Sequence, residues 1–288
     1  MLQSLDHVIV GVRDLDAATK TYTALLGREP SWRGAHPGSG TANTLFRVAN
    51  TYLELLAPVE SGATAAMLRA RLDADGEGLV GMAFGTDDAD KLVGELRARG
   101  LSPTDPIRGT GRDQKTGAER AWKNVILPTS DSRGLLVFAI EHLSKPDDLP
   151  LIAPNVAREA AFAALDHVVV QTRDAEATRA FYSEKLGLRL ALDRTFENRG
   201  VRLMFFRVAG VTVEVASRLA SEVDPAAPDH LIGLAWQVPD ADSACSRLAA
   251  AGVAVSAVRA GRKAGTRVFT VEGETHGVAT LVIEPFGG

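Results

Sequence analysis

A histidine and a glutamate recur at the same two places in each half of this 288-residue chain. His7 and His167 lie 160 residues apart, and Glu54 and Glu214 are separated by the same interval. Imidazole and carboxylate groups are common choices for acid–base catalysis and as ligands of divalent metal ions. The repeated pair is therefore the first candidate for chemistry in this sequence.

Carboxylates also occur inside apolar segments that are typical of strands. Glu54 lies in TYLELLA, Glu141 in LVFAIEH and Glu284 in LVIEP. Burying a carboxylate is costly unless it faces water, pairs with a cation or binds a metal. Because side chains alternate along a strand, Glu54 shares a face with Tyr52, and the leucines on either side of it point to the opposite face. We expect these three glutamates to face a cavity, either as catalytic groups or as ligands of a divalent ion.

The matching residues belong to a longer repeat. LDHVIVGVRDLDAATKTYTALLG begins at Leu5, and LDHVVVQTRDAEATRAFYSEKLG begins at Leu165. A repeat of this length indicates duplicated structural units. The first segment alternates as a half-buried strand that places Leu5, His7 and Ile9 on one face.

Each unit is expected to contain a strand, a helix and three further strands. The first unit has a strand at 5–12 and then a helix that Asp14 caps and Gly27 ends. The other units begin near residues 79, 165 and 231. The segment SKPDDLPLIAPN contains three prolines that disfavour regular structure. The expected domains are therefore 1–143 and 161–288, joined by a linker at 144–160.

Four units of this kind, paired into two cups, resemble the vicinal oxygen chelate superfamily. It includes glyoxalase I, extradiol dioxygenases, methylmalonyl-CoA epimerase, fosfomycin resistance enzymes and bleomycin resistance proteins. The pattern LDHVxVxVxDxxxAxxxY is typical of the first strand and helix of these proteins, and the stretch from His36 to Pro58 is similar to the glyoxalase-like subfamily. The resemblance covers nearly the whole chain and implies an α+β fold of four βαβββ modules in two tandem domains. It does not determine the reaction, because the superfamily includes isomerases, lyases, dioxygenases and binding proteins.

The resemblance also implies a ligand set, because each cup of the superfamily's metalloenzymes takes up to four ligands from the first and last strands of its units. The implied metal ligands are His7, Glu54 and Glu141 in one cup and His167, Glu214 and Glu284 in the other. The fourth position is Gly81 in the first cup and Gly233 in the second, so both lack the second histidine of the family. This loss disfavours the iron triad of an extradiol dioxygenase. One divalent ion per cup (Zn, Ni, Mn or Mg) is the implied cofactor, and glycine leaves volume for a larger ligand.

The same residues have a metal-free interpretation. Each histidine follows an aspartate and can hydrogen-bond within the fold. The glutamates can pair with Arg47 or Arg207, whose positions also repeat.

Further polar residues are candidate substrate contacts. His36, Thr41 and Asn43 belong to a Gly/Ser/Thr-rich turn whose N–H groups can face an anion. In the second half, Arg199 and Arg202 can hold a carboxylate, although solvated surface arginines are more common.

Four other side chains carry structural expectations. Tyr22 and Tyr182 fall on the apolar stripes of helices and are expected to pack in the core. Alternation turns His142 away from the cup, because it directly follows Glu141. His276, in the turn ETHGVAT, is expected to be exposed.

Composition excludes several classes of partner. A net charge of −4 without a basic face argues against nucleic acid, and no apolar run approaches the roughly 20 residues that span a bilayer. A single cysteine, Cys245, excludes an internal disulfide framework and suggests a reducing cytoplasm. A monomer or homodimer acting on a small molecule is expected.

Two hypotheses for function follow, and a third possibility is that one cup is functional and the other is structural. The first is a metal-assisted lyase or isomerase, in which the ion chelates adjacent oxygens of a small substrate and stabilises an enediolate. The alternative is a metal-free protein that sequesters a small ligand, as bleomycin resistance proteins do.

Overall fold

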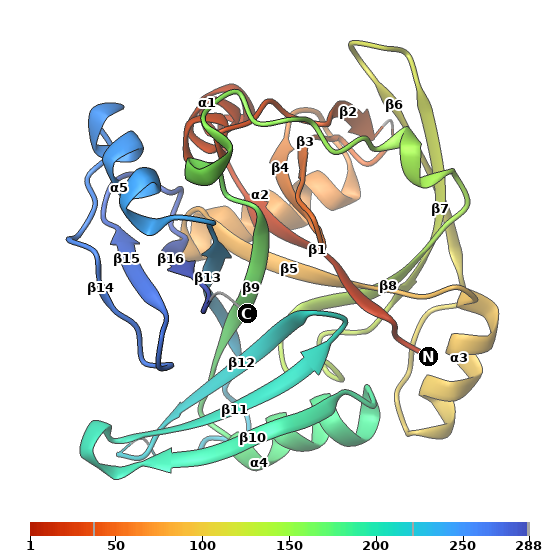
Figure 1. Ribbon diagram of the computed structural model, residues 1–288. Coiled ribbons are helices and arrows are strands. Elements are labelled where there is room, and N and C mark those ends of the chain that lie inside the picture. Colours follow the sequence, from red (N-terminus) through yellow and green to blue (C-terminus); the bar gives the residue numbers. More distant parts are fainter. Residues whose placement is uncertain (37, 221, 287–288) are drawn as a thin grey trace.

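The computed structural model describes residues 1–36, 38–220 and 222–286, and it contains four consecutive βαβββ modules (Figure 1). The first module comprises β1 (Ser4–Gly11), α1 (Leu15–Leu26), β2 (Trp32–His36), β3 (Thr41–Arg47) and β4 (Tyr52–Pro58). After α2 (Ala63–Asp75), the second comprises β5 (Gly78–Gly85), α3 (Ala89–Ala98), β6 (Ile107–Asp113), β7 (Glu119–Ile126) and β8 (Leu136–His142). The predicted α+β fold of two tandem domains is confirmed.

The second half repeats this order of elements. The third module comprises β9 (Ala164–Thr172), α4 (Ala175–Ala180), a π-helical turn (Phe181–Lys185), β10 (Arg189–Phe196), β11 (Val201–Val208) and β12 (Val211–Arg218). The fourth comprises β13 (His230–Gln237), α5 (Ala241–Ala250), β14 (Arg259–Ala260), β15 (Arg267–Val271) and β16 (Ala279–Glu284). Short 3₁₀ turns lie at Pro146–Asp148, Arg158–Ala160 and Glu197–Arg199.

An aspartate begins the helix of every module. Its carboxylate accepts hydrogen bonds from backbone N–H groups of the first helical turn, which have no partner within the helix. The capping residues are Asp14, Asp88, Asp174 and Asp240. Because this capping depends on residues close together in sequence, it indicates where each of these helices begins.

The two domains differ in how their sheets end. The first forms a closed barrel in the order β1-β4-β3-β2-β6-β7-β8-β5, whereas the second is an open sheet in the order β10-β11-β12-β9-β13-β16-β15-β14. Strands β2 and β6 close the barrel by pairing Gly34 with Asp113 and Ala35 with Arg112. A Cβ atom on Gly34 would lie only 2.5 Å from Nε1 of Trp32, and one on Gly109 only 2.4 Å from Nε1 of Trp122. Glycines therefore let two indole rings pack along the seam.

The inner face of the barrel is covered from two sides. On α2, Leu68 and Leu72 pack against Ile9 and Leu56 of the inner face. At the other side, Leu149 of the segment after β8 is buried with a group of inner-face residues, which are Trp32, Leu45 and Tyr52. Polar side chains inside the barrel are therefore largely shielded from water.

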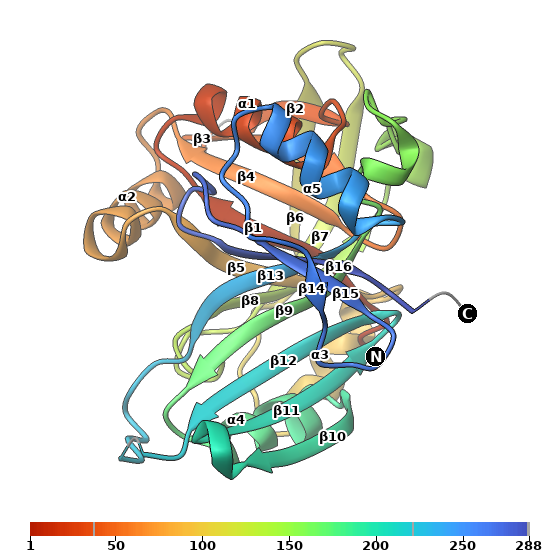
Figure 2. The same ribbon diagram turned by 60° about the vertical axis from the view of Figure 1, so that its left-hand side comes forward.

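The two domains share one continuous hydrophobic core. In Figure 2, α5 of the second domain lies beside α1 of the first, and the Arg247 guanidinium on α5 donates to the carbonyls of Ala24 and Leu25 at the end of α1. The Tyr22 hydroxyl donates to the Thr275 carbonyl across the same boundary. Tyr22 and Tyr182 are both buried in the core.

A bulge in β1 changes the expected facing of its first residues. Leu5 pairs with Phe84 and His7 pairs with Ala83, so Asp6 is the extra residue on this strand. Leu5 therefore joins the core together with Val8 instead of sharing the face of His7. The prediction that Leu5, His7 and Ile9 share one face is wrong for Leu5. The second domain has the same bulge at Asp166.

Candidate functional site

The structure brings the repeated histidine and glutamate together in both domains. Strand β1 runs parallel to β4, and Nε2 of His7 lies 3.4 Å from Oε2 of Glu54. In the second domain, Nε2 of His167 lies at the same distance from Oε2 of Glu214. The first pair is the more enclosed, with residue exposures of 3% for His7 and 8% for Glu54.

The bulge places an aspartate against the other nitrogen of each histidine. Asp6 Oδ1 lies 2.7 Å from Nδ1 of His7, and Asp166 Oδ1 lies 2.8 Å from Nδ1 of His167. The second oxygen of Asp6 is 2.9 Å from Nε2 of His142. Each domain therefore contains a row of aspartate, histidine and glutamate in which both ring nitrogens face a carboxylate.

Opposing effects set the ionisation of Asp6. Burial raises the pKa of this carboxyl, but the hydrogen bonds and positive charge of His142 and His7 outweigh burial and hold the pKa well below its usual range. Asp6 is therefore an anion at neutral pH. Tyr52 stacks on His7 with ring centroids 4.5 Å apart, and burial followed by the charge of Asp6 raises the pKa of its phenol.

The candidate substrate contacts of the first domain gather around Glu54. Asn43 Nδ2 donates to Glu54 Oε1 at 2.8 Å, and His36 Nε2 lies 3.3 Å from the same nitrogen. At the other ring nitrogen of His36, Nδ1, the hydroxyl oxygen of Thr41 lies at 3.0 Å. Asn43 Oδ1 is buried without a hydrogen-bond partner in the described part of the chain, so it is a free acceptor inside the barrel.

Glu141 does not join this group. Its carboxylate accepts from the Ala89 backbone N–H at 2.9 Å, at the start of α3, and lies 3.4 Å from Nζ of Lys123. The expected convergence of Glu141 with His7 and Glu54 is therefore wrong. The reason is register: Val137, Ala139 and Glu141 share the helix-facing side of β8.

Glu284 has the same structural role in the second domain. It accepts from the Ala241 backbone N–H at 2.9 Å, at the start of α5, and lies 3.5 Å from Arg267. Glu284 is therefore not placed beside His167 and Glu214. Helix N-termini attract carboxylates because their first N–H groups lack partners and carry partial positive charge.

His142 lies on the opposite face of β8 from Glu141, and its expected facing is also wrong. The sequence predicted that it turns away from the cup, but its ring reaches Asp6 beside His7. Arg47, proposed as a partner for Glu54, donates instead to the carbonyls of Pro146 and Leu149. These two hydrogen bonds hold the segment after β8 against the barrel.

The two glycines in the ligand positions have a packing reason. A Cβ atom on Gly81 would lie 2.9 Å from the Leu136 carbonyl oxygen, and one on Gly233 would lie 2.8 Å from the Ala279 carbonyl oxygen. Neighbouring strands approach too closely there for any larger residue. The expected extra ligand volume at Gly81 is filled by the Leu136 side chain, 3.0 Å from that Cβ position.

These placements do not fit the ligand set that the resemblance implied. Of the three implied ligands, each cup brings together the imidazole and one carboxylate, while the second carboxylate accepts a hydrogen bond from the backbone at a helix N-terminus. Among residues 1–36, 38–220 and 222–286, no group of three His, Cys, Asp or Glu side chains is arranged to hold a metal ion.

The remaining predicted residues lie elsewhere. Arg202 forms ion pairs with Glu176 and Asp193 near the surface, so its charge is already paired within the protein. Arg199 is exposed beside the Phe196 ring. His276 was expected to be exposed, but it is 8% exposed and lies 2.7 Å from Glu77 of the first domain. A local sequence pattern cannot show such a contact between domains.

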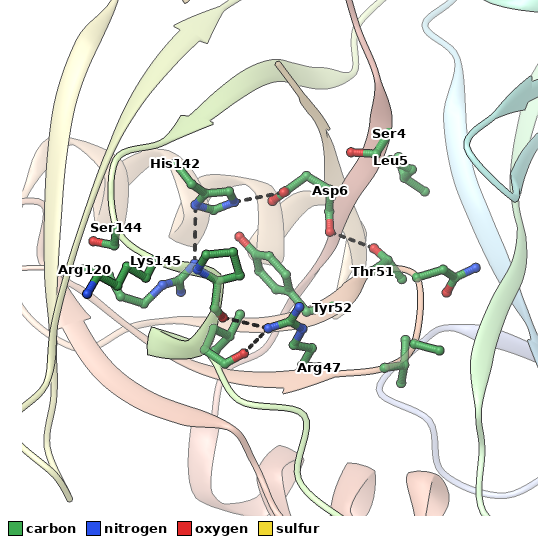
Figure 3. A pocket seen from close by; sticks show the side chains of 15 residues that line it. Ser4, Leu5, Asp6, Arg47, Thr51, Tyr52, Arg120, His142, Ser144 and Lys145 are labelled. Carbon is green, nitrogen blue, oxygen red and sulfur yellow. Dashed lines mark hydrogen bonds and ion pairs between the residues drawn. The ribbon is translucent and has the colours of Figure 1, made fainter. Parts of the chain in front are cut away.

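A polar pocket of about 260 Å³ opens next to Asp6, at the start of β1 (Figure 3). We call it the mouth pocket. The side chains that line it include Asp6, the cations Arg47, Arg120 and Lys145, and the imidazole of His142. Sequence reasoning did not find this site, because it combines isolated residues of β1, β3, β4, β7 and β8 with the turn before β4 and the segment that follows β8.

Two family models match the chain. The model described as "Glyoxalase-like domain" matches residues 5–161, more than half of the chain. The protein belongs to this family. The model described as "Glyoxalase/Bleomycin resistance protein/Dioxygenase superfamily" matches residues 164–281 of the second domain. The predicted membership of the vicinal oxygen chelate superfamily is thereby confirmed.

Solved structures of the same fold cover the whole chain. A mutant of 4-hydroxymandelate synthase from Streptomyces coelicolor has a TM-score of 0.70 at 16% identity, over 100% of this chain and 94% of the other. A hypothetical protein from Staphylococcus aureus has a TM-score of 0.67 at 12% identity, over 98% and 99%. BphC, a halotolerant catechol dioxygenase, has a TM-score of 0.62 at 12% identity, over 99% and 87%. At these identities the likeness shows the fold alone.

No curated protein matches the sequence. In the described ranges, no helix is long and apolar enough to cross a membrane.

Proposed function

We propose that this glyoxalase-like protein binds a small oxygenated molecule in its first domain without a resident metal ion. The observation that carries the proposal is the position of Glu141 and Glu284. In both domains the carboxylate that would complete a three-residue metal site receives a backbone N–H from a helix start instead. This arrangement leaves two of the three implied ligands together in each cup.

The polar groups inside the barrel support a binding role. Glu54 accepts from Asn43, which keeps one free amide oxygen, and His36 lies beside them. Apolar walls with a few fixed polar groups are typical of small-molecule sites. Such an arrangement can orient hydroxyl or carbonyl oxygens of a ligand without forming a covalent bond to it.

The metal-assisted lyase or isomerase is the second candidate, and one observation favours it. The distance between histidine Nε2 and glutamate Oε2 is 3.4 Å in both domains, although the barrel is closed in one and the sheet is open in the other. A divalent ion with water or substrate oxygens as its other ligands would supply a Lewis acid there. An extradiol dioxygenase stays disfavoured by Gly81 and Gly233, and ferrous reconstitution followed by a catechol cleavage assay would test it.

The melting temperatures of Glu54→Gln and Glu214→Gln separate the two candidates. Without a metal, glutamine at position 54 still accepts from Asn43, and we expect the melting temperature to be the same with and without chelator in wild type and both variants. With a resident metal, wild type loses stability on chelation by mass action, and the variants do so less. Elemental analysis of protein purified without chelator is the second readout. Stoichiometric metal that both variants lose would contradict the metal-free proposal.

A further inference from the structure

Arg120 on β7 is a buried cation without an ionic partner in the described part of the chain. The residue is 7% exposed, and its guanidinium lies 5.5 Å from the Trp32 ring and 5.8 Å from the Tyr52 ring. Its polar neighbour is Nδ1 of His142 at 3.5 Å, at the limit of a hydrogen bond. Buried charges are costly unless they are paired, so this guanidinium favours an added anion.

Asp6 does not serve as that anion. Both of its oxygens already lie within hydrogen-bond distance of histidine rings, one of His7 and one of His142. The two rings account for its low pKa, whereas Arg120 is not among the groups that lower it. The carboxylate that lines the pocket therefore already has hydrogen-bond partners.

The mouth pocket has the charge that an anionic ligand needs. Figure 3 shows Arg120, Arg47 and Lys145 lining it together with Asp6, which makes three cations against one carboxylate. This excess of positive charge occurs in a chain whose formal net charge is −4. The hydroxyl groups of Thr51 and Ser144 also line the pocket, and Thr51 already donates to the Asp6 carbonyl.

The size of the pocket limits the ligand. A volume of about 260 Å³ is just below the roughly 300–1,000 Å³ of typical ligand sites, so it suits a molecule of about one ring. One wall is the turn at Pro146–Asp148, which Arg47 holds by donating to the Pro146 and Leu149 carbonyls. That contact leaves Arg120 and Lys145 as the cations available to a ligand.

We propose that the mouth pocket binds the carboxylate of a small organic acid, with Arg120 as the principal contact and Lys145 at the rim. A planar guanidinium matches a carboxylate with two parallel hydrogen bonds. The Trp32 and Tyr52 rings fix the guanidinium plane before the ligand arrives. This inference deepens the proposed function by naming the charge of the ligand, and it rests on that function only in placing the ligand in the first domain.

The test is calorimetric titration of the full chain with sodium benzoate, against sodium chloride at equal ionic strength and sodium phosphate as a second anion. The variants are Arg120→Met, Lys145→Met and the control Arg108→Met. Arg108 is an exposed arginine on the adjacent strand β6, outside the pocket. We expect saturable benzoate binding to wild type, weakened roughly tenfold or more by Arg120→Met, a few-fold by Lys145→Met and not by Arg108→Met.

Three results would overturn the inference: no benzoate binding to wild type, binding that survives Arg120→Met undiminished, or binding of phosphate alone. If Arg120→Met does not fold, the variant of the exposed Lys145 decides: benzoate binding that Lys145→Met leaves undiminished would then overturn the inference. Metal content is measured on the same samples. Stoichiometric metal would contradict the metal-free function without touching the Arg120 result, whereas loss of benzoate binding would leave the metal-free function standing.

Discussion

At the scale of single residues, the same row of aspartate, histidine and glutamate has different surroundings in the two domains. In the first, the second oxygen of Asp6 is held by His142, and in the second the corresponding oxygen of Asp166 accepts from Gln237 at 2.8 Å. The partner of this oxygen is thus the titratable ring of His142 in the first domain, next to the mouth pocket, and the amide of Gln237 in the second. This difference makes the first domain the better candidate for a functional site.

Asp6 predicts a pH dependence of stability. Its pKa in the folded protein lies below the value near 3.9 of an unfolded chain. A depressed pKa contributes stability that is present above the unfolded value and is lost as pH falls through the folded value. We expect Asp6→Asn to lose roughly 1–3 kcal/mol of unfolding free energy at pH 7. Urea denaturation should show this difference shrinking below about pH 4, and a constant difference down to pH 2 would refute it.

Gly81 predicts a local steric effect. A methyl group there would meet the Leu136 carbonyl at 2.9 Å, and backbone in a paired strand cannot move aside cheaply. We expect Gly81→Ala to lower the unfolding free energy by roughly 1–3 kcal/mol. The matched control is Gly94→Ala on α3, where a Cβ meets nothing within 4 Å and alanine should stabilise the helix by about 0.5–1 kcal/mol. Equal effects of the two changes in chemical denaturation would contradict this interpretation.

At the scale of elements, the last strand of each domain contacts the start of a helix through a glutamate. The last strand of the barrel, β8, places Glu141 at the start of α3, and the last strand of the second domain, β16, places Glu284 at the start of α5. Asp88 and Asp240 cap the same two helices. Each helix start therefore has two carboxylates on its unpaired N–H groups, which ties the helix to the strand.

This contact predicts the effect of removing one glutamate. Glu141→Ala leaves the Ala89 N–H and the charge of Lys123 without this partner, and we expect a loss of about 1 kcal/mol with unchanged metal content. Glu119→Ala is the control, because Glu119 is exposed at the start of β7 and should change stability by less than about 0.5 kcal/mol. Thermal denaturation and elemental analysis read both outcomes. Metal lost together with Glu141 would return this residue to the ligand set.

At the scale of the whole molecule, contacts across the domain boundary are extensive. Arg133 and Asp229 form an ion pair at 3.2 Å, His276 pairs with Glu77, and Arg247 binds the end of α1. The hydrophobic core also runs through both domains without interruption. The two domains are therefore expected to unfold as one unit.

Calorimetry should show a single transition, with calorimetric and van't Hoff enthalpies in agreement. Arg247→Met removes three hydrogen bonds to carbonyls and should lower stability by roughly 1–3 kcal/mol without splitting the transition. Arg259→Met, an exposed change on β14, is the control and should have little effect. Two resolved transitions in the wild type would contradict the shared core.

Much of the architecture could be predicted from the sequence because it depends on local patterns. The interval of 160 residues, the capping aspartates and the glycines that end helices are read along the chain. The alternation of TYLELLA also placed Glu54 on the face that meets His7. Local spacing is enough for these features, because each depends on residues close together in sequence.

Only the tertiary structure decided which polar groups meet. Alternation states which residues of a strand share a face, but not which face turns inward, and so Glu141 and His142 were assigned to the wrong sides. A one-residue bulge at Asp6 reverses facing within a strand without a distinct sequence signal. The closure of only the first sheet, the burial of His276 and the mouth pocket around Arg120 all depend on pairings between distant strands. Such pairings are set by packing of the whole chain, and no single segment carries them.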